Sequence, residues 1–296
     1  MRVFVTGATG FVGSATVQEL LRAGHKVLGL ARSDAGANAI AAAGAEVLRG
    51  NLEDLDSLRR GVAQADGVIH TGFNHDFSRF KENCETDRRA IEAMGAELAG
   101  SNRPLIVTSG IGLLRPGGVV TENVQPASNP SIPRVSEQTA YAAAEKGARV
   151  SIIRLPPSVH GAGDHGFVPI LIGIAREKGA SIYTGEGLNR WPAVHRLDAA
   201  RLYRLVLEKG RAGARYHAVA EAGIPFREIA AVIGRRLGVP VVGKSPEESA
   251  AHFGWFAHFA AIDNQASSAL TRQELGWEPT QAGLIEDVDQ AVYFQA

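Results

Sequence analysis

The chain has 296 residues, of which 45% are hydrophobic and 21% are charged, an ordinary balance for a globular protein. This length exceeds that of one small domain and favours a large α/β domain with a smaller partner. Lysine plus arginine equals aspartate plus glutamate at 31 each, so the formal net charge is zero. Without a basic run, the composition argues against binding to nucleic acid or to an anionic membrane.

The single cysteine and the first residues predict where the protein works. Cys84 has no second cysteine with which to form an internal disulfide, which fits a reducing compartment. A strand that starts at Arg2 leaves no room for a signal peptide, and no apolar run is long enough to span a bilayer. We therefore expect a cytoplasmic protein.

Apolar runs and turn residues predict an alternation of strands and helices. The predicted strands are residues 2–6, 26–31, 45–48, 67–70, 104–108 and 149–154. The predicted helices are residues 11–23, 34–43, 78–99, 135–146 and 198–208. The strands are apolar throughout rather than alternating, which is typical of a parallel sheet with helices on both faces. We expect the α/β class and a doubly wound Rossmann domain.

Two regions depart from this alternation. Residues 110–133 are rich in proline and have no apolar period, and a loop of that length is usually functional. After residue 156 the pattern loosens into helices with short strands. We expect a Rossmann domain at 1–160, rejoined by 196–218, and a smaller, mostly C-terminal α/β substrate lobe made of 161–195 and 219–296.

Three glycines separate the first strand from the first helix. Their spacing is G-x-x-G-x-x-G, at Gly7, Gly10 and Gly13. One glycine permits the tight turn, the next lets the backbone approach a pyrophosphate, and the third lets helix and strand pack closely. The helix then offers free N–H groups to the phosphates. The turn predicts a dinucleotide held by Gly7, Ala8, Thr9, Gly10, Phe11, Val12 and Gly13.

The end of the second strand indicates which dinucleotide binds. Enzymes that use NAD tend to carry an acid there, whereas an arginine accommodates the 2′-phosphate of NADP. This chain has Arg32, followed by Ser33, whose hydroxyl can add a hydrogen bond. The alternative is a solvated arginine after a strand. We predict NADP.

The chain resembles the extended short-chain dehydrogenase/reductases, the epimerase/dehydratase-like group. The segment 6–13, with sequence TGATGFVG, is similar to the opening of that family, and 154–161, RLPPSVHG, is similar to the segment that passes the nicotinamide. The segment 194–198, VHRLD, resembles the return from strand to helix in sugar-nucleotide epimerases, and Asn83 matches an asparagine of the family. The resemblance covers almost the whole length.

This resemblance implies further cofactor contacts and a mode of association. The residues that it places beside the cofactor are Asn51, Leu52, His70, Thr71, Gly72, Thr108, Pro156, Pro157 and Ser158. Related proteins often pair through the two long helices after the fourth and fifth strands, so a homodimer is an expectation.

The catalytic Tyr-x-x-x-Lys pair of the family is absent from its expected place. The tyrosine position falls near residues 133–134, Pro-Arg, and the lysine position near residues 137–138, Glu-Gln. Tyr141 and Lys146 are five residues apart and too deep in the helix. The chain therefore resembles atypical members, which keep the cofactor fold and lack the usual catalytic residues.

Reduction of a carbonyl needs a proton donor and a group that stabilises the developing oxyanion. The serine of the family falls on Ser109 or Gly110, depending on register. Arg134 can supply charge where the lysine is missing, although its high pKa makes it a poor proton donor. His160 follows the segment near the nicotinamide, and a histidine side chain is a residue type suited to proton transfer near neutral pH. Our candidates are Ser109, Arg134 and His160, with a structural role for His160 as the alternative.

Other polar and aromatic residues are candidates for the substrate side. Trp191 can stack on a ring and Arg190 can pair with an acid or phosphate, unless Trp191 packs between the lobes. The full set is His165, Arg190, Trp191 and His195. The aromatic segment 254–259 is interpreted as lobe packing, with a wall toward the substrate. The histidines lack the spacing of a zinc site, so no metal is expected.

We weighed three functions. The favoured one is an NADP-dependent oxidoreductase of the short-chain dehydrogenase/reductase type that acts on a small organic carbonyl or a related unsaturated compound with a non-standard proton donor. A sugar-nucleotide epimerase or dehydratase is disfavoured by Arg32 and by the missing catalytic pair. A non-catalytic NADP-binding redox sensor is compatible with the missing pair but does not explain a substrate lobe.

Overall fold

The computed structural model describes residues 1–114, 117–126 and 133–295. In this part of the chain, seven strands form a parallel sheet in the order β3-β2-β1-β4-β5-β6-β10. They are β1 (Arg2–Thr6), β2 (Lys26–Ala31), β3 (Glu46–Arg49), β4 (Gly67–His70), β5 (Pro104–Gly110), β6 (Arg149–Leu155) and β10 (Arg215–His217). This is the doubly wound order, and the strand order reverses between β1 and β4, where such sheets bind ligands. The predicted Rossmann fold is confirmed.

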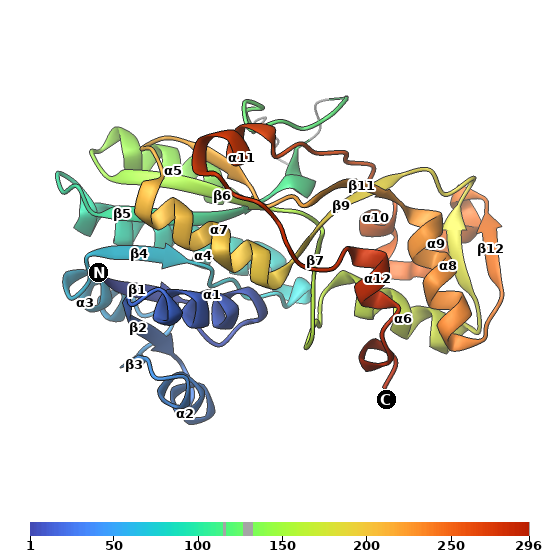
Figure 1. Cartoon of the computed structure of the whole chain (residues 1–296), viewed down its shortest axis with the longest axis horizontal. Coiled ribbons are helices and arrows are strands. Elements are labelled where there is room, and N and C mark those ends of the chain that lie inside the picture. Colours follow the sequence, from blue (N-terminus) through green and yellow to red (C-terminus); the bar gives the residue numbers. More distant parts are fainter. Residues whose placement is uncertain (115–116, 127–132, 296) are drawn as a thin grey trace.

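Helices cover both faces of this sheet. They are α1 (Phe11–Arg22), α2 (Asp34–Ala42), α3 (Leu55–Ala63), α4 (Phe80–Leu98), α5 (Ser136–Glu145) and α7 (Arg196–Lys209). Alternate residues of β1 point into different cores: Val3 packs with α1 and α7, whereas Phe4 packs with α3, α4 and α5. Helices α1 and α7 lie side by side on one face (Figure 1).

Helix α3 was not predicted. It begins after Asp54, whose side chain accepts the Ser57 N–H at 3.1 Å and so caps the helix. The proline-rich loop was predicted over residues 110–133. Its described part starts with a short turn of helix, η2 (Ile111–Leu113), and Val120 bridges to Ala266. Residues 115–116 and 127–132 of that loop lie outside the described residues.

The second lobe has its own core at the other end of the molecule (Figure 1). Its strands form two small sheets, in the orders β11-β9-β7 and β12-β8. The strands are β7 (Ser158–His160), β8 (Ser181–Thr184), β9 (Arg190–His195), β11 (Glu221–Pro225) and β12 (Val241–Lys244). The helices are α6 (Phe167–Lys178), α8 (Phe226–Leu237), α9 (Pro246–Phe253), α10 (Ala257–Ala260) and α12 (Leu284–Val288), with short turns η3 (Gly254–Phe256) and η4 (Ala291–Tyr293).

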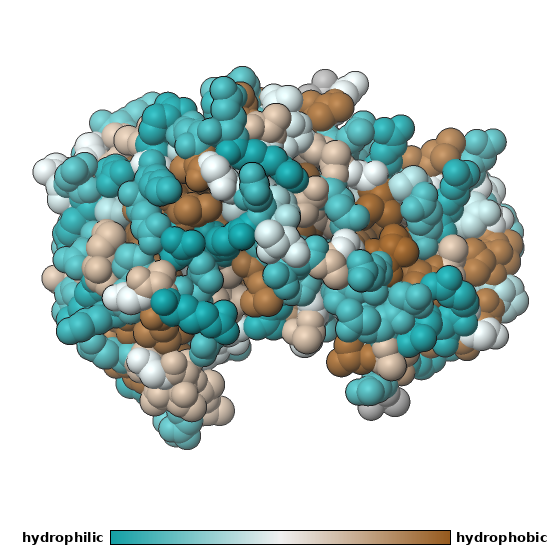
Figure 2. All heavy atoms as spheres, in the orientation of Figure 1, coloured by the Kyte–Doolittle hydropathy of each residue, from teal (hydrophilic) through white to brown (hydrophobic). Residues whose placement is uncertain are grey.

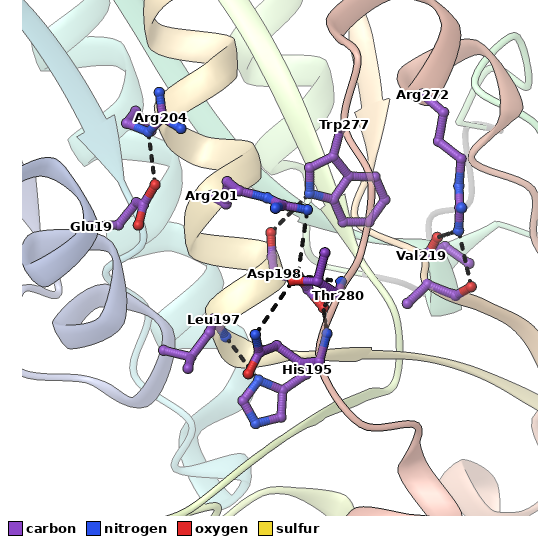
Figure 3. A network of polar contacts seen from close by, with 12 residues as sticks. Glu19, His195, Leu197, Asp198, Arg201, Arg204, Val219, Arg272, Trp277 and Thr280 are labelled. Atoms are coloured by element: carbon purple, nitrogen blue, oxygen red, sulfur yellow. Dashed lines mark hydrogen bonds and ion pairs between the residues drawn. The ribbon is translucent and has the colours of Figure 1, made fainter. Parts of the chain in front are cut away.

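The C-terminal part of the chain crosses from the sheet to the lobe. Helix α11 (Ala269–Leu275) packs against β10 and α7, and Trp277 joins the core beside α7, although we placed residues 219–296 in the lobe. Asp198 holds the crossing: its carboxylate accepts the N–H groups of Thr280 and Gln281 at 3.0 Å (Figure 3).

The surface mixes polar and apolar residues, and the molecule is hollowed along one edge between the Rossmann end and the lobe (Figure 2). Among the described residues, no helix combines the length and the apolar character needed to cross a membrane.

Candidate active site

The glycine turn lies where β1 meets α1, and two of its glycines are required by packing. Gly7 has a φ of +67°, and a Cβ there would lie 2.7 Å from the Gly72 nitrogen. A Cβ on Gly13 would lie 2.0 Å from the Gly7 oxygen. At Gly10 a Cβ would meet only that same oxygen, at 3.2 Å. Gly10 is exposed, so this glycine leaves room on the open side of the turn.

Helix α1 begins at this turn with its N–H groups available. Gly10 is the N-cap, no side chain of the described residues caps the helix, and its first turn has no acidic residue. Such a helix end attracts anions through its free N–H groups and its dipole. Phe11 is half-buried; the Arg196 guanidinium lies 4.7 Å from its ring centroid, and the His165 ring meets it edge-on at 5.7 Å.

The carboxyl ends of β2 and β3 bring two arginines together. Arg32 is exposed directly after β2, and Ser33 caps α2 by accepting the Gly36 N–H at 3.1 Å. Arg49 ends β3 in register with the end of β2, and its guanidinium donates to Asp34 Oδ1 at 2.6 Å and to the Ser33 carbonyl. The edge of the sheet that we assigned to the 2′-phosphate therefore carries two arginines, of which Arg49 is paired with Asp34 and Arg32 is exposed.

The other predicted cofactor residues lie around this edge. Asn51 Oδ1 accepts the N–H groups of Glu53 and Asp54 at 2.8 and 3.0 Å, so its side chain shapes the turn before α3. Leu52 lies beside Gly72, and Thr71 Oγ1 donates to the Thr6 carbonyl. Pro156 and Pro157 connect β6 to β7, and Ser158 is the first residue of β7.

A buried hydrogen-bond chain runs from Gly72 to helix α4. Thr6 Oγ1 accepts the Gly72 N–H at 3.2 Å and lies 2.7 Å from His70 Nδ1, and His70 Nε2 lies 3.0 Å from Asp87 Oδ1. A carboxylate only accepts, so Nε2 carries a proton and the Thr6 hydroxyl can donate to Nδ1. The His70 ring is 1% exposed, so it supports the site from within.

The chain continues through Ser136 to Arg134. Ser136 donates to Asp87 Oδ2 at 2.5 Å, and Arg134 Nε donates to Ser136 Oγ at 3.2 Å. Burial alone would raise the pKa of Asp87, but the hydrogen bond from His70, the charge of Arg134 and the bond from Ser136 hold it below its usual value. Asp87 is therefore a buried carboxylate that balances Arg134.

The Arg134 guanidinium lies over the Phe73 ring, 4.1 Å from its centroid. Phe73 directly follows Gly72, so this contact brings Arg134 to the carboxyl end of β4, beside the glycine turn. Desolvation by its neighbours, together with the charge of Arg134, lowers the pKa of His75 to about 4. His75 is thus neutral near pH 7.

The end of β5 supplies Thr108 and Ser109. Thr108 Oγ1 donates to the His70 carbonyl at 2.7 Å and lies 2.7 Å from the Tyr203 hydroxyl. Burial raises the pKa of Tyr203, which therefore stays protonated and donates to Thr108. Ser109 is the second-to-last residue of β5 and is 3% exposed.

His160 faces the C-terminal segment. Its Nδ1 lies 2.8 Å from Asp287 Oδ2, and the Tyr293 hydroxyl both donates to Asp287 and accepts the Gly161 N–H at 2.8 Å. The ring is 0% exposed and lies 5.4 Å from the ring of His195, which caps α7. These contacts favour the structural role for His160.

The predicted substrate residues separate in space. Trp191 is 0% exposed and packs against Phe167 and Phe226 in the lobe core, so it has no face left for a substrate ring. Arg190 is exposed and donates to Gln265 Oε1 at 2.8 Å. His165 is the member of this set that reaches the glycine turn, through its contact with Phe11.

Comparison with known proteins identifies the family of the chain. A family model described as NAD(P)H-binding matches residues 7–155, which is half of the chain. The chain belongs to the NAD(P)H-binding family. An uncharacterized protein of Schizosaccharomyces pombe is 54% identical over 99% of this chain and 100% of that protein. The structure of DesIV, a dTDP-glucose 4,6-dehydratase of Streptomyces venezuelae with NAD and TYD bound, aligns over 99% of this chain and 97% of that one with a TM-score of 0.77 and 21% identity.

A more distant relative of this NAD(P)H-binding chain carries the name of a reductase. It is the 4-hydroxy-2-methyl-3-oxo-4-farnesyl-3,4-dihydroquinoline-1-oxide ketoreductase of Stigmatella aurantiaca, 26% identical over 91% of this chain and 84% of that protein. The resemblance to the extended short-chain dehydrogenase/reductases is therefore confirmed. Its relatives and structural neighbours include both oxidoreductases and epimerases or dehydratases.

Helix α5 lies in the region where we expect the catalytic pair of the family to be missing. Glu137 forms a buried ion pair with Arg154, with Arg154 Nε 3.0 Å from Oε2. The Tyr141 hydroxyl donates to Glu137 at 3.0 Å, and burial together with that carboxylate raises the pKa of Tyr141 to about 12. Lys146 lies at the far end of the helix. The Tyr141 hydroxyl therefore stays protonated near neutral pH.

Five residues of the site were not singled out from the sequence: Arg49, Phe73, His75, Asp87 and Ser136. Two signals were present. A carboxylate on the apolar face of α4 needs a buried partner, which indicates Asp87. The pairing of β2 with β3 places Arg49 beside Arg32. No local pattern indicates the other three.

Proposed function

We propose that this chain is an NADP-dependent oxidoreductase that reduces the carbonyl group of a small organic substrate. The observation that carries the proposal is the placement of Arg134. Its guanidinium is held by Ser136 and by the Phe73 ring. Phe73 follows Gly72, which packs against Gly7 of the glycine turn. A cation fixed at this point would stabilise the negative charge that develops on the oxygen of a reacting carbonyl.

The preference for NADP over NAD rests on charge at the ends of β2 and β3. Arg32 is exposed and can reach a 2′-phosphate, while Arg49 donates to the Ser33 carbonyl and pairs its charge with Asp34. Ser33 lies between them at the start of α2. An enzyme specific for the ribose 2′-hydroxyl would instead place an acid at this position.

Bound NADPH would supply the hydride. Arg134 would then stabilise the oxyanion, and Asp87, through Ser136, would keep the guanidinium in place. Arg134 does not release a proton near neutral pH, and neither does the neutral His75. We therefore assign the proton to solvent that reaches the bound carbonyl.

The experiment follows NADPH oxidation with a panel of aldehydes and ketones. We expect turnover in the wild-type protein, and a fall of about 100- to 1000-fold in kcat in Arg134→Met, the usual effect of losing one oxyanion donor. The affinity for NADPH should not change, and Arg59→Met, an exposed arginine of α3, is the matched control. Wild-type turnover that survives intact in Arg134→Met would overturn the role of Arg134.

Two other functions lead to different results. An epimerase or dehydratase is supported by relatives such as the UDP-glucose 4-epimerase of Streptomyces lividans, and it would purify with tightly bound NAD. A redox sensor would bind NADPH without oxidising it with any carbonyl in the panel, while its contact with a partner protein depended on the cofactor.

A further inference from the structure

Aromatic rings from both halves of the molecule meet beside Arg134. We call Phe73, His75, Phe77, Trp255 and Phe259 the aromatic wall. The first three follow β4 in the Rossmann domain, and the last two belong to the lobe. The His75 ring lies 5.1 Å from Phe73 and 6.3 Å from Phe77, and the Phe77 ring lies 5.7 Å from Trp255 and 5.3 Å from Phe259. The contacts therefore form a continuous path from Gly72 to the lobe.

The aromatic wall differs from the core beneath it because its rings are not hidden. Trp255 is 60% exposed, and Phe73, Phe77 and Phe259 are each half-buried. In the lobe core, Trp191 and Phe256 are 0% exposed. A cluster of exposed aromatic faces is unfavourable in water, and such surfaces usually serve binding.

The aromatic wall begins at Arg134, the residue that we propose to bind the carbonyl oxygen. Phe73 carries the Arg134 guanidinium on its face and follows Gly72, which abuts the glycine turn. His165 of the lobe touches Phe11 at the start of α1 and lies close enough to His75 to influence its charge. The exposed rings, the fixed cation and the turn therefore belong to one site.

We infer that the substrate is an aromatic aldehyde or ketone whose ring packs against Trp255 and Phe77 while its carbonyl oxygen faces Arg134. This inference rests on the proposed function. In the reaction, a hydride adds to the carbonyl carbon, the C=O double bond becomes a single bond, and the oxygen takes a proton from solvent. The products are a benzylic-type alcohol and NADP⁺.

The geometry favours a flat ring over a saturated one. Aromatic pairs gain energy in edge-to-face and offset arrangements beyond what their apolar area contributes. With two rings of the wall in contact, an aromatic substrate should be preferred over a saturated one of the same size by about tenfold or more. The competing explanation is that the aromatic wall only clamps the lobe to the Rossmann domain.

The first test compares benzaldehyde with cyclohexanecarbaldehyde, which has the same number of carbons but no flat ring. We expect kcat/KM to be about tenfold or more higher for benzaldehyde. Trp255→Leu keeps apolar bulk and should bring the ratio close to one, whereas Trp255→Phe should retain most of the preference. A wild-type ratio near one, or a ratio unchanged in Trp255→Leu, would overturn the inference.

The second test does not depend on turnover. Trp255 is exposed, whereas Trp191 and Trp277 are 0% exposed, so iodide should quench mainly the fluorescence of Trp255. In the presence of NADP⁺, benzyl alcohol should protect Trp255 from iodide and cyclohexylmethanol should not. Equal protection, or none, would mean that the aromatic wall is only a clamp. If neither aldehyde is reduced but protection is selective, the proposed reduction fails while the aromatic site stands.

Discussion

Arg134 and Ser136 form the link between the buried hydrogen-bond chain and the open side of the site. Ser136 uses its proton for Asp87 and its lone pair for Arg134, so one hydroxyl connects a buried carboxylate to the guanidinium. The aromatic face of Phe73 supports the guanidinium from another side. Arg134 is therefore positioned before any substrate arrives, which lowers the cost of organising charge during the reaction.

Ser136→Ala should lower kcat by about tenfold, because Arg134 loses its hydrogen bond and Asp87 loses a donor. The affinity for NADPH should remain, and Ser136→Thr should restore much of the rate. The matched control is Ser151→Ala: Ser151 is also buried, and it donates to the Arg211 carbonyl at 2.9 Å on the amino-terminal half of β6. If both alanine variants lost only stability and kept the same kcat, Ser136 would have no positioning role.

Arg32 should decide the choice of dinucleotide. We expect NADPH to bind about ten- to a hundred-fold more tightly than NADH. The reason is that a charge-assisted hydrogen bond to the 2′-phosphate contributes a binding free energy that corresponds to this ratio. Arg32→Asp should narrow this gap in a fluorescence titration with both cofactors. Equal affinities in the unmodified protein would contradict the assignment.

Asp164 should make stability depend on pH. Burial raises its pKa to about 6, although Oδ1 accepts the Gly166 N–H at 2.7 Å. In the unfolded chain the pKa returns to about 4. The folded state therefore binds more protons between about pH 4 and 6, and the free energy of unfolding falls as the pH rises through this window.

Asp164→Asn should remove the fall in the free energy of unfolding between about pH 4 and 6. Calorimetric Tm values at several pH values between 4 and 7 measure this change, with Asp56→Asn, an exposed carboxyl group of α3, as the control. The same pH dependence in wild type and Asp164→Asn would show that another group is responsible.

At the scale of elements, two glycines of the glycine turn have different roles: Gly13 is needed for packing, and Gly10 is expected to serve cofactor binding. Gly13→Ala should destabilise the fold by about 1–3 kcal/mol, because its Cβ would lie 2.0 Å from the Gly7 oxygen. Gly10→Ala meets only one atom, at 3.2 Å, and should change Tm little while it weakens NADPH binding. Thermal unfolding and cofactor titration of both variants check this, and equal losses of binding and Tm in the two variants would contradict it.

The elements of the first half could be predicted because they depend on local patterns. Buried runs gave the strands of the Rossmann sheet, with β1 at residues 2–6 and β4 at 67–70 as expected. Helix α3 was missed although both signals were present: Leu55, Leu58 and Val62 recur at helical spacing, and Asp54 was available as an N-cap. The small sheets of the lobe have three to six residues per strand, too short for a clear period.

The site could be predicted only where neighbours in sequence form it. The glycine turn is such a case. The contact between Asp87 and Ser136 joins residues 49 positions apart, and periodicity carries no information about such a pair. Trp191 looked available for a substrate because an aromatic residue beside Arg190 and His195 suggested a cleft, but the fold turns its side chain into the lobe core.

At the scale of the whole molecule, the lobe is tied to the Rossmann domain on both sides of the site. Asp198 of α7 binds the C-terminal crossing at Thr280 and Gln281 (Figure 3), and Phe77 meets Trp255 in the aromatic wall. The loop around His165 reaches the glycine turn from the lobe. The lobe therefore contributes directly to the surroundings of the cofactor turn.

The most direct test of this account is a crystal structure of the protein with NADP⁺ and benzyl alcohol. The account predicts the alcohol oxygen beside the nicotinamide C4, within hydrogen-bond distance of the Arg134 guanidinium, and the Arg134–Ser136–Asp87 contacts intact. An alcohol oxygen bound instead by His160 or by Tyr141, with Arg134 turned away from it, would contradict the account.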